Sequence, residues 1–346
     1  MSSPTPLSAL DLSFVTTQTP PSKALAQTIE LAKHLDGLGY KRLWLAEHHS
    51  LASIASSAPE IMIGQVAAVT QNIRVGSGGV MLTNHAPLMV AERFKLLEAL
   101  FPGRIDLGLG RAPGTDQVTA FALRRKMEER QGDDFLERLQ ELMLWETGEF
   151  PEGHPFNKVF AMPTDAPLPP IWLLGSSDYS AQLAAQIGVG YSFASHFSDF
   201  DAVAPMRAYR EMFRPSETLD KPYSIIALAA VVAETDEEAD HLAKTYDLNW
   251  IRRARGEMKP LASPEEADAH PWTEAERAYV ARKRVRLFSG SPRTVVTRLR
   301  RFVEETEADE VMVTSSVFDH GKRMRSYELL MREWVATAGA PATLEA

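Results

Sequence analysis

The sequence predicts an α/β fold of the TIM (β/α)8 barrel type, formed by residues 1–346 as a single domain. Short apolar runs, too brief for helices, alternate with amphipathic stretches, and the alternation yields eight β/α units. Eight parallel strands, each followed by a crossover helix, close into a barrel. The expected strands are Ala9–Val15, Arg42–Ala46, Ile73–Gly79, Ile105–Leu109, Ile171–Leu174, Tyr191–Ala194, Ser224–Val232 and Glu310–Thr314.

Two connecting helices follow directly from their periodicity. The first ends at Gly37 and Gly39 and carries one apolar stripe, made of Leu25, Ile29, Ala32, Leu35 and Leu38. A later helix begins after Pro87 and stops before Pro102 and Gly103. A doubly wound parallel sheet is the alternative arrangement of the same units.

Two segments do not fit the repeat and are expected to be insertions after strands four and seven. Residues 148–170 are rich in proline and glycine, and residues 256–272 contain three prolines and several acidic residues. We interpret both as excursions on the barrel surface. The second is a candidate lid over a substrate.

Charge and composition exclude several classes of function. Lys and Arg total 37 against 46 Asp and Glu, so the formal charge of −9 disfavours nucleic acid as a partner. The chain has no cysteine, which excludes disulfides, thiolate metal sites and cysteine nucleophiles. No basic start with an apolar segment and no long apolar run is present, so we expect a cytoplasmic protein that does not cross a membrane.

Histidines collect where strands end, which is the catalytic face of a TIM barrel. Five of the nine lie there, namely His48, His49, His85, His196 and His320. Adjacent residues of a strand point to opposite faces, so His48 and His49 cannot both face the barrel axis. Without a His-x-His or His-Glu-x-x-His pair, we do not expect a metal site.

Glycines are dense around strands three and four, at residues 76–79 and 108–114. Glycine weakens a strand unless another group must approach the backbone closely. A flat ligand over the barrel mouth would require such glycines. Relief of crowding inside the barrel is the other explanation, and the sequence leaves both open.

An anion site is predicted from two further features. Arg111 ends strand four among glycines, and an arginine fork suits a carboxylate or phosphate. Gly175, Ser176 and Ser177 end strand five and precede an amphipathic helix, whose free N–H groups favour an anion. An ordinary helix cap by Ser177 or Asp178 is the alternative. Together the two features indicate a ligand that carries a phosphate.

Four motifs in order show that the chain resembles the bacterial-luciferase-like flavin-dependent monooxygenases, more narrowly the "luciferase family oxidoreductase, group 1" subgroup. The resemblance covers essentially the whole length. It is carried by Trp44-Leu45-Ala46-Glu47-His48-His49, by residues 76–82 (Gly-Ser-Gly-Gly-Val-Met-Leu), by residues 102–114 (Pro-Gly-Arg-Ile-Asp-Leu-Gly-Leu-Gly-Arg-Ala-Pro-Gly) and by Trp172-Leu173-Leu174-Gly175-Ser176.

The resemblance implies a barrel whose mouth holds FMN or, in some branches, the deazaflavin F420. It implies a cis peptide at Gly78-Gly79 under the flavin ring, next to Ser77. It assigns the cofactor phosphate to Arg111, Gly175, Ser176 and Ser177. His48 is implied as the acid/base, and His196 as part of the flavin pocket. Asn84 and His85 would bound the ribityl or substrate side.

The reaction implied by the resemblance begins with reduced FMN, which a separate NAD(P)H:flavin reductase supplies. Reaction with O2 gives a C4a-peroxyflavin that oxygenates a small organic substrate, while the protein positions the flavin and controls protons. Hydride transfer with FMN or F420, and flavin binding without turnover, are the alternatives on the same fold.

A homodimer is expected from the apolar content of the second and third helices. Ile61, Met62, Ile63 and Val66, together with the segment Phe94–Phe101, give more apolar surface than one helix covers.

Overall fold

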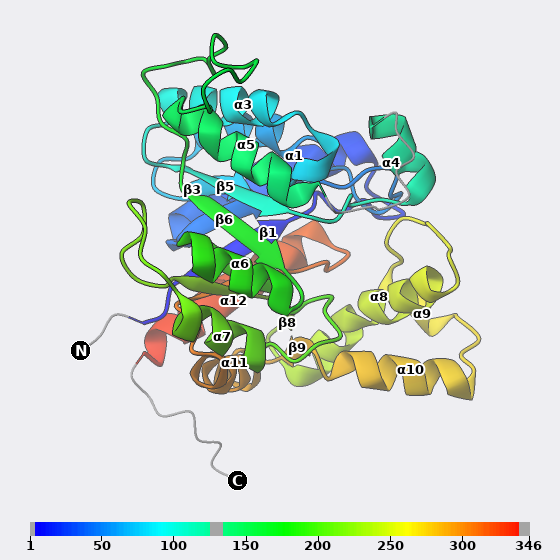
Figure 1. Cartoon of the computed structure of the whole chain (residues 1–346). Helices are drawn as coiled ribbons and strands as arrows, with labels where there is room; N and C mark the ends of the chain where they lie inside the picture. Colours follow the sequence, from blue (N-terminus) through cyan, green and yellow to red (C-terminus); the bar gives the residue numbers. More distant parts are fainter. Residues whose placement is uncertain (1–3, 125–133, 339–346) are drawn as a thin grey trace.

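The computed structural model describes residues 4–124 and 134–338 and contains a closed parallel barrel (Figure 1). Neighbouring strands pair in parallel around the ring, and β10 pairs with both β8 and β1, which closes it. The predicted TIM barrel is therefore confirmed. Its strands in order are β1 (Leu7–Asp11), β2 (Arg42–Leu45), β3 (Arg74–Ser77), β5 (Ile105–Gly110), β6 (Ile171–Gly175), β7 (Gly190–Ala194), β8 (Ser224–Val232) and β10 (Glu310–Thr314).

Helices surround the barrel, and the two predicted from periodicity are among them. The first ends at Gly39, whose φ of 81° only glycine adopts without strain. The surrounding helices are α1 (Pro21–Leu38), α2 (Pro59–Val69), α3 (Pro87–Leu100), α4 (Gln117–Arg124), α5 (Phe135–Thr147), α6 (Asp178–Ile187), α7 (Val203–Met212), α11 (Pro292–Thr306) and α12 (His320–Ala336). No helix in the described part of the chain is long and apolar enough to span a bilayer.

The predicted bounds of the first strand are wrong by two residues at its start and four at its end. The start was placed too late because the polar Ser8 suggests a solvent-exposed position. In the structure Ser8 is buried and its hydroxyl donates to the Glu310 carboxylate. Beyond Asp11 the strand is interrupted at Ser13, whose φ is 53°, and Val15 pairs with the loop after β2 through a 2.9 Å bond to the Ser53 carbonyl. The sequence also missed β4 (Val80–Met81), the short 3-10 helix η1 (Leu82–Asn84) and β9 (Leu287–Gly290).

Both expected insertions lie outside the barrel strands. Residues 148–170 contain no helix or strand and pack on α3, where the Lys95 ammonium donates to the Ala166 carbonyl at 3.1 Å. The second insertion is larger than expected and lies between β8 and β10. It comprises α8 (Asp236–Ala254), α9 (Pro264–Asp268), α10 (Glu274–Arg284) and β9, with the three helices grouped at one side of the barrel (lower right of Figure 1).

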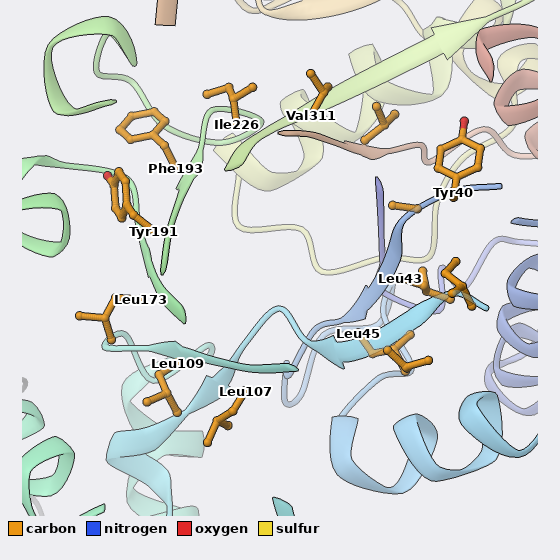
Figure 2. Packing of buried hydrophobic residues seen from close by; sticks show 14 of the residues in the cluster. Tyr40, Leu43, Leu45, Leu107, Leu109, Leu173, Tyr191, Phe193, Ile226 and Val311 are labelled. Carbon is orange, nitrogen blue, oxygen red and sulfur yellow. The ribbon is translucent and has the colours of Figure 1, made fainter. Parts of the chain in front are cut away.

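Alternation along the strands separates two cores. One set of side chains points outward and packs against the helices, as Figure 2 shows for Leu43, Leu107 and Phe193 among others. The other set faces the barrel axis in layers. The floor is charged, the middle layer contains Trp44 and Trp172, and the uppermost positions are small. These small residues are Ala46, Gly78, Gly110 and Ala229, at or directly after the C-terminal ends of their strands.

Candidate active site

His48 lies at the barrel mouth, directly after β2. Its backbone N–H donates to the Ser56 carbonyl at 2.9 Å, and its Nδ1 lies 3.1 Å from the Gly114 carbonyl oxygen. A carbonyl only accepts, so Nδ1 carries the proton and Nε2 of the neutral ring is left as a proton acceptor. Burial lowers the pKa of His48 below 6.5, and the nearby charge of Arg253 lowers it further. At neutral pH His48 is therefore an uncharged base.

His196 follows β7 and approaches the same mouth. Its backbone N–H donates to the Ala227 carbonyl at 3.2 Å, and its Nδ1 lies 3.4 Å from the same oxygen. Burial lowers the pKa of His196 to about 4, and His48 contributes in the same direction. The structure thus brings together the two histidines that the sequence singled out, both uncharged at neutral pH.

Glu47 organises the mouth, and the sequence assigned no role to it. The carboxylate is fully buried and accepts from the Met81 backbone N–H at 2.8 Å and from the Nε2 atoms of His49 at 2.8 Å and His85 at 3.0 Å. Burial alone would raise its pKa, but these bonds outweigh burial and lower the pKa of Glu47 to about 2. The sequence feature that could have revealed Glu47 is an acidic residue that directly follows a run of apolar residues.

Asn84 and His85 are both hydrogen-bonded to the Glu47 carboxylate. The Asn84 amide donates to Glu47 at 3.2 Å and to the Pro113 carbonyl at 3.0 Å, and its oxygen accepts from Arg124 at 3.1 Å. These bonds use both amide hydrogens, so Asn84 fixes η1 and α4 to the end of β2. Contact of either residue with a substrate or ribityl chain stays a prediction.

His320 is the exception among the five histidines. It is the first residue of α12, and its Nε2 lies 3.3 Å from the Glu30 carboxylate on α1. Its side chain therefore belongs to the helical layer outside the barrel. Placing it with the mouth histidines was wrong, because its position after a strand says nothing about the direction of its side chain.

Crowding explains several of the glycines. A Cβ on Gly108 would lie 2.1 Å from the Ser77 carbonyl oxygen, and one on Gly78 would lie 2.7 Å from a Leu10 methyl group. The peptide bond between Gly78 and Gly79 is cis, as the resemblance implied. The Ser77 hydroxyl is buried and donates to the Gly108 carbonyl at 2.8 Å. The Ser77 side chain therefore links β3 to β5, and contact of Ser77 with the cofactor stays a prediction.

The predicted anion site is assembled across β5 and β6. The Arg111 guanidinium is exposed and lies 4.5 Å from the ring centroid of Tyr179, the second residue of α6. It forms no ion pair with any residue in the described ranges. Ser177 takes the N-cap position of α6 but makes no side-chain cap bond, which removes the ordinary-cap alternative for this serine.

Gly175 and Ser176 shape the approach to α6. A Cβ on Gly175 would lie 2.5 Å from the Cβ of Ser180, so only glycine permits this close turn. The Ser176 carbonyl accepts from the Ser198 hydroxyl at 2.9 Å, which fixes the loop. Arg111 and the start of α6 therefore lie together, with free N–H groups at the helix start and a guanidinium that stacks on Tyr179 but has no ion-pair partner in the described ranges, a combination suited to a phosphate.

A sequence profile described as luciferase-like monooxygenase matches residues 7–310. The chain belongs to the luciferase-like monooxygenase family. A family member from Escherichia coli strain K12, named luciferase-like monooxygenase, is 40% identical over 324 residues, which cover 94% of this chain and 95% of that one. An N-acetyl-S-alkylcysteine monooxygenase from Bacillus subtilis strain 168 is 32% identical over 94% of this chain and 96% of its own.

Solved structures agree with the family assignment. The crystal structure of apo-MsnO8 superposes with a TM-score of 0.87 at 36% identity, covering 95% of this chain and 98% of that chain. The protein is accordingly an enzyme of the luciferase-like, flavin-dependent family, and the residues at its barrel mouth are the candidates for its chemistry.

Proposed function

We propose that the protein is an FMN-dependent monooxygenase. It would use reduced FMN, supplied by a separate NAD(P)H:flavin reductase, together with O2 to oxygenate a small organic substrate. The observation that carries the proposal is Arg111, which has no ion-pair partner in the described ranges and stacks on Tyr179 at the uncapped start of α6, close to the small residues that end the barrel strands. That arrangement suits a flat ring with a phosphate tail.

Relatives favour oxygenation over the alternatives. The oxygenating constituent of 3,6-diketocamphane monooxygenase, solved in complex with FMN, shares the fold with a TM-score of 0.70 at 18% identity. An F420-dependent secondary alcohol dehydrogenase shares it equally well at 14% identity, so the fold alone does not separate the two cofactors. The relatives at 32% and 40% identity, however, are named monooxygenases.

The residues of the mouth would have separate roles in cofactor binding and proton transfer. Arg111 and the N–H groups of α6 would bind the phosphate, and Ala46, Gly78 and Gly110 would leave room for the ring. Bound reduced FMN supplies the electrons that activate O2. His48 would accept a proton at Nε2, since Gly114 holds the proton of the neutral ring on Nδ1. Glu47 would position this loop through His49, His85 and Met81.

Replacement of Arg111 by alanine tests the phosphate assignment. Loss of a charge-assisted contact is expected to weaken FMN binding by about 10- to 100-fold, whereas riboflavin, which lacks the phosphate, should bind as before. Equilibrium titration followed by flavin fluorescence measures both ligands. Arg293→Ala, at an exposed arginine of α11, is the matched control. An equal loss for FMN and riboflavin, or no loss, contradicts the assignment.

We also propose a homodimer formed through α2 and α3, on a smaller surface than the sequence indicated. Met62, Ile63, Val66 and Phe94 are buried against the barrel and cannot contribute. Ile61, Leu96 and Leu100 remain 65%, 54% and 63% exposed, which is unusual for apolar side chains on neighbouring helices.

Light scattering is expected to give twice the chain mass of 38.4 kDa. The double variant Ile61→Glu/Leu96→Glu should give a folded monomer, because two buried charges per subunit would oppose association. Val285→Glu, an exposed apolar position outside these helices, should remain a dimer. A monomeric wild-type protein at working concentration contradicts the proposal.

A further inference from the structure

The C-terminal end of α8 carries three arginines, and two of them have acidic partners. Arg252 reaches Glu266 at 3.2 Å, and Arg255 reaches Glu276 at 2.5 Å. Arg253 lies between them, is exposed, and forms no ion pair or side-chain hydrogen bond with any residue from 4–124 or 134–338. The chain has nine more acidic than basic charges, so acidic partners are not scarce. The Arg253 guanidinium is therefore available to an anion from outside the chain.

Backbone pairing places the end of α8 beside the His48 loop. Leu261, after α8, donates to the Val15 carbonyl at 2.9 Å and accepts from the Thr17 N–H at 3.1 Å. Val15 in turn donates to Ser53, in the same loop that bonds the His48 N–H. The insertion, the extension of β1 and the His48 loop thus form one continuous arrangement. The effect of Arg253 on the pKa of His48 agrees with this proximity.

The chemistry around Arg253 leaves it without an internal counter-ion. His48 and His196 are uncharged at neutral pH, and the Glu47 carboxylate is already bonded to His49, His85 and Asn84. Arg111 lies at the start of α6, after β5, and is assigned to the cofactor phosphate. A second anion at the mouth would therefore come from another ligand.

We propose that Arg253 binds a carboxylate of the organic substrate and so holds that substrate beside His48. The inference rests on the proposed function and narrows it to substrates that are small organic acids. A guanidinium fork matches the two oxygens of a carboxylate and binds them with two parallel hydrogen bonds. Because Arg253 belongs to the insertion, the insertion would determine which substrates are accepted.

Hexanoate and its neutral analogue hexanamide test the proposal by isothermal titration calorimetry on the full-length protein. Wild-type protein is expected to bind hexanoate about tenfold or more tightly than hexanamide. Arg253→Gln should remove that difference, and Arg253→Lys should retain part of it. Arg277→Gln, at an exposed arginine on α10, should behave as wild type. Equal affinities in wild-type protein, no saturable binding of hexanoate, or unchanged preference in Arg253→Gln would overturn the proposal.

A second readout needs no added ligand. The pKa of His48, followed by NMR of its ring protons, is expected to rise in Arg253→Gln because a nearby positive charge is removed. An unchanged His48 pKa would show that Arg253 does not face the mouth and would overturn the proposal. FMN titration of the same variant separates the two hypotheses: failure of wild-type protein to bind FMN contradicts the proposed function, whereas the hexanoate preference concerns Arg253 alone.

Discussion

His48→Gln is expected to lower the rate of substrate oxygenation by about 10²- to 10⁴-fold, the contribution typical of a positioned general base. Glutamine preserves the size and polarity of the side chain but cannot take up a proton at the position of Nε2. The affinity for FMN should change little, because Arg111 and α6 bind the phosphate in this proposal. Turnover is measured with the best substrate from a screen that includes thioethers, terpenes and organic acids.

The pH dependence gives this prediction a second test. Because the pKa of His48 lies below 6.5, the neutral base predominates above that pH and is lost as the pH falls through the lowered value. Wild-type kcat/KM should therefore decline on the acid side with a midpoint below 6.5, and His48→Gln should lack this limb. His241→Gln on α8 is the matched control. Retention of both the rate and the acid limb in His48→Gln would show that another group is the base.

The barrel floor is expected to produce the largest effect on stability. Arg42 is buried and donates to Glu310 at 2.6 Å and to Asp106 at 2.8 Å. Burial opposes its charge, yet the two carboxylates outweigh burial and raise the pKa of Arg42. Arg42→Met would remove the buried cation that Glu310 and Asp106 share and leave them only the partly exposed Lys41 and Arg74 as partners, at a cost of about 3–5 kcal/mol in the free energy of unfolding.

Urea unfolding followed by circular dichroism measures this cost. Arg325→Met is the matched control because the Arg325–Glu234 pair is 39% and 57% exposed, and its loss should cost no more than about 1 kcal/mol. Equal destabilisation by the two substitutions would mean that the floor network contributes no more than a surface ion pair.

The fold could be predicted from the sequence because periodicity is a local property. Strand alternation and helical stripes are visible within ten residues, and the barrel follows from their count and order. The first strand was misplaced because its polar Ser8 finds its partner, Glu310, 302 residues away. The short strand β9 was missed because it has only four residues, too few to show strand alternation within a long insertion.

The candidate site was predictable only in part, for a related reason. Arg111 could be predicted because an arginine among glycines is unusual. The α6 start could be predicted because a glycine and two serines directly precede a helix. Both features are visible in a few neighbouring residues. Glu47 became meaningful only once the fold placed Met81, Asn84 and His85 around it, 34 to 38 residues along the chain. The bond from the Ser77 hydroxyl to the neighbouring strand could not be predicted, because its partner Gly108 lies 31 residues along the chain.

Rapid mixing shows whether the protein activates O2 with reduced FMN. Protein loaded anaerobically with reduced FMN is mixed with oxygenated buffer, and flavin absorbance is followed over time, with free reduced FMN as the reference. Bound flavin is expected to reoxidise through a phase that free FMN lacks, and His48→Gln is expected to alter this phase. Reoxidation indistinguishable from that of free FMN, with reduced FMN shown to be bound, would contradict oxygen activation and leave hydride transfer or flavin binding without turnover.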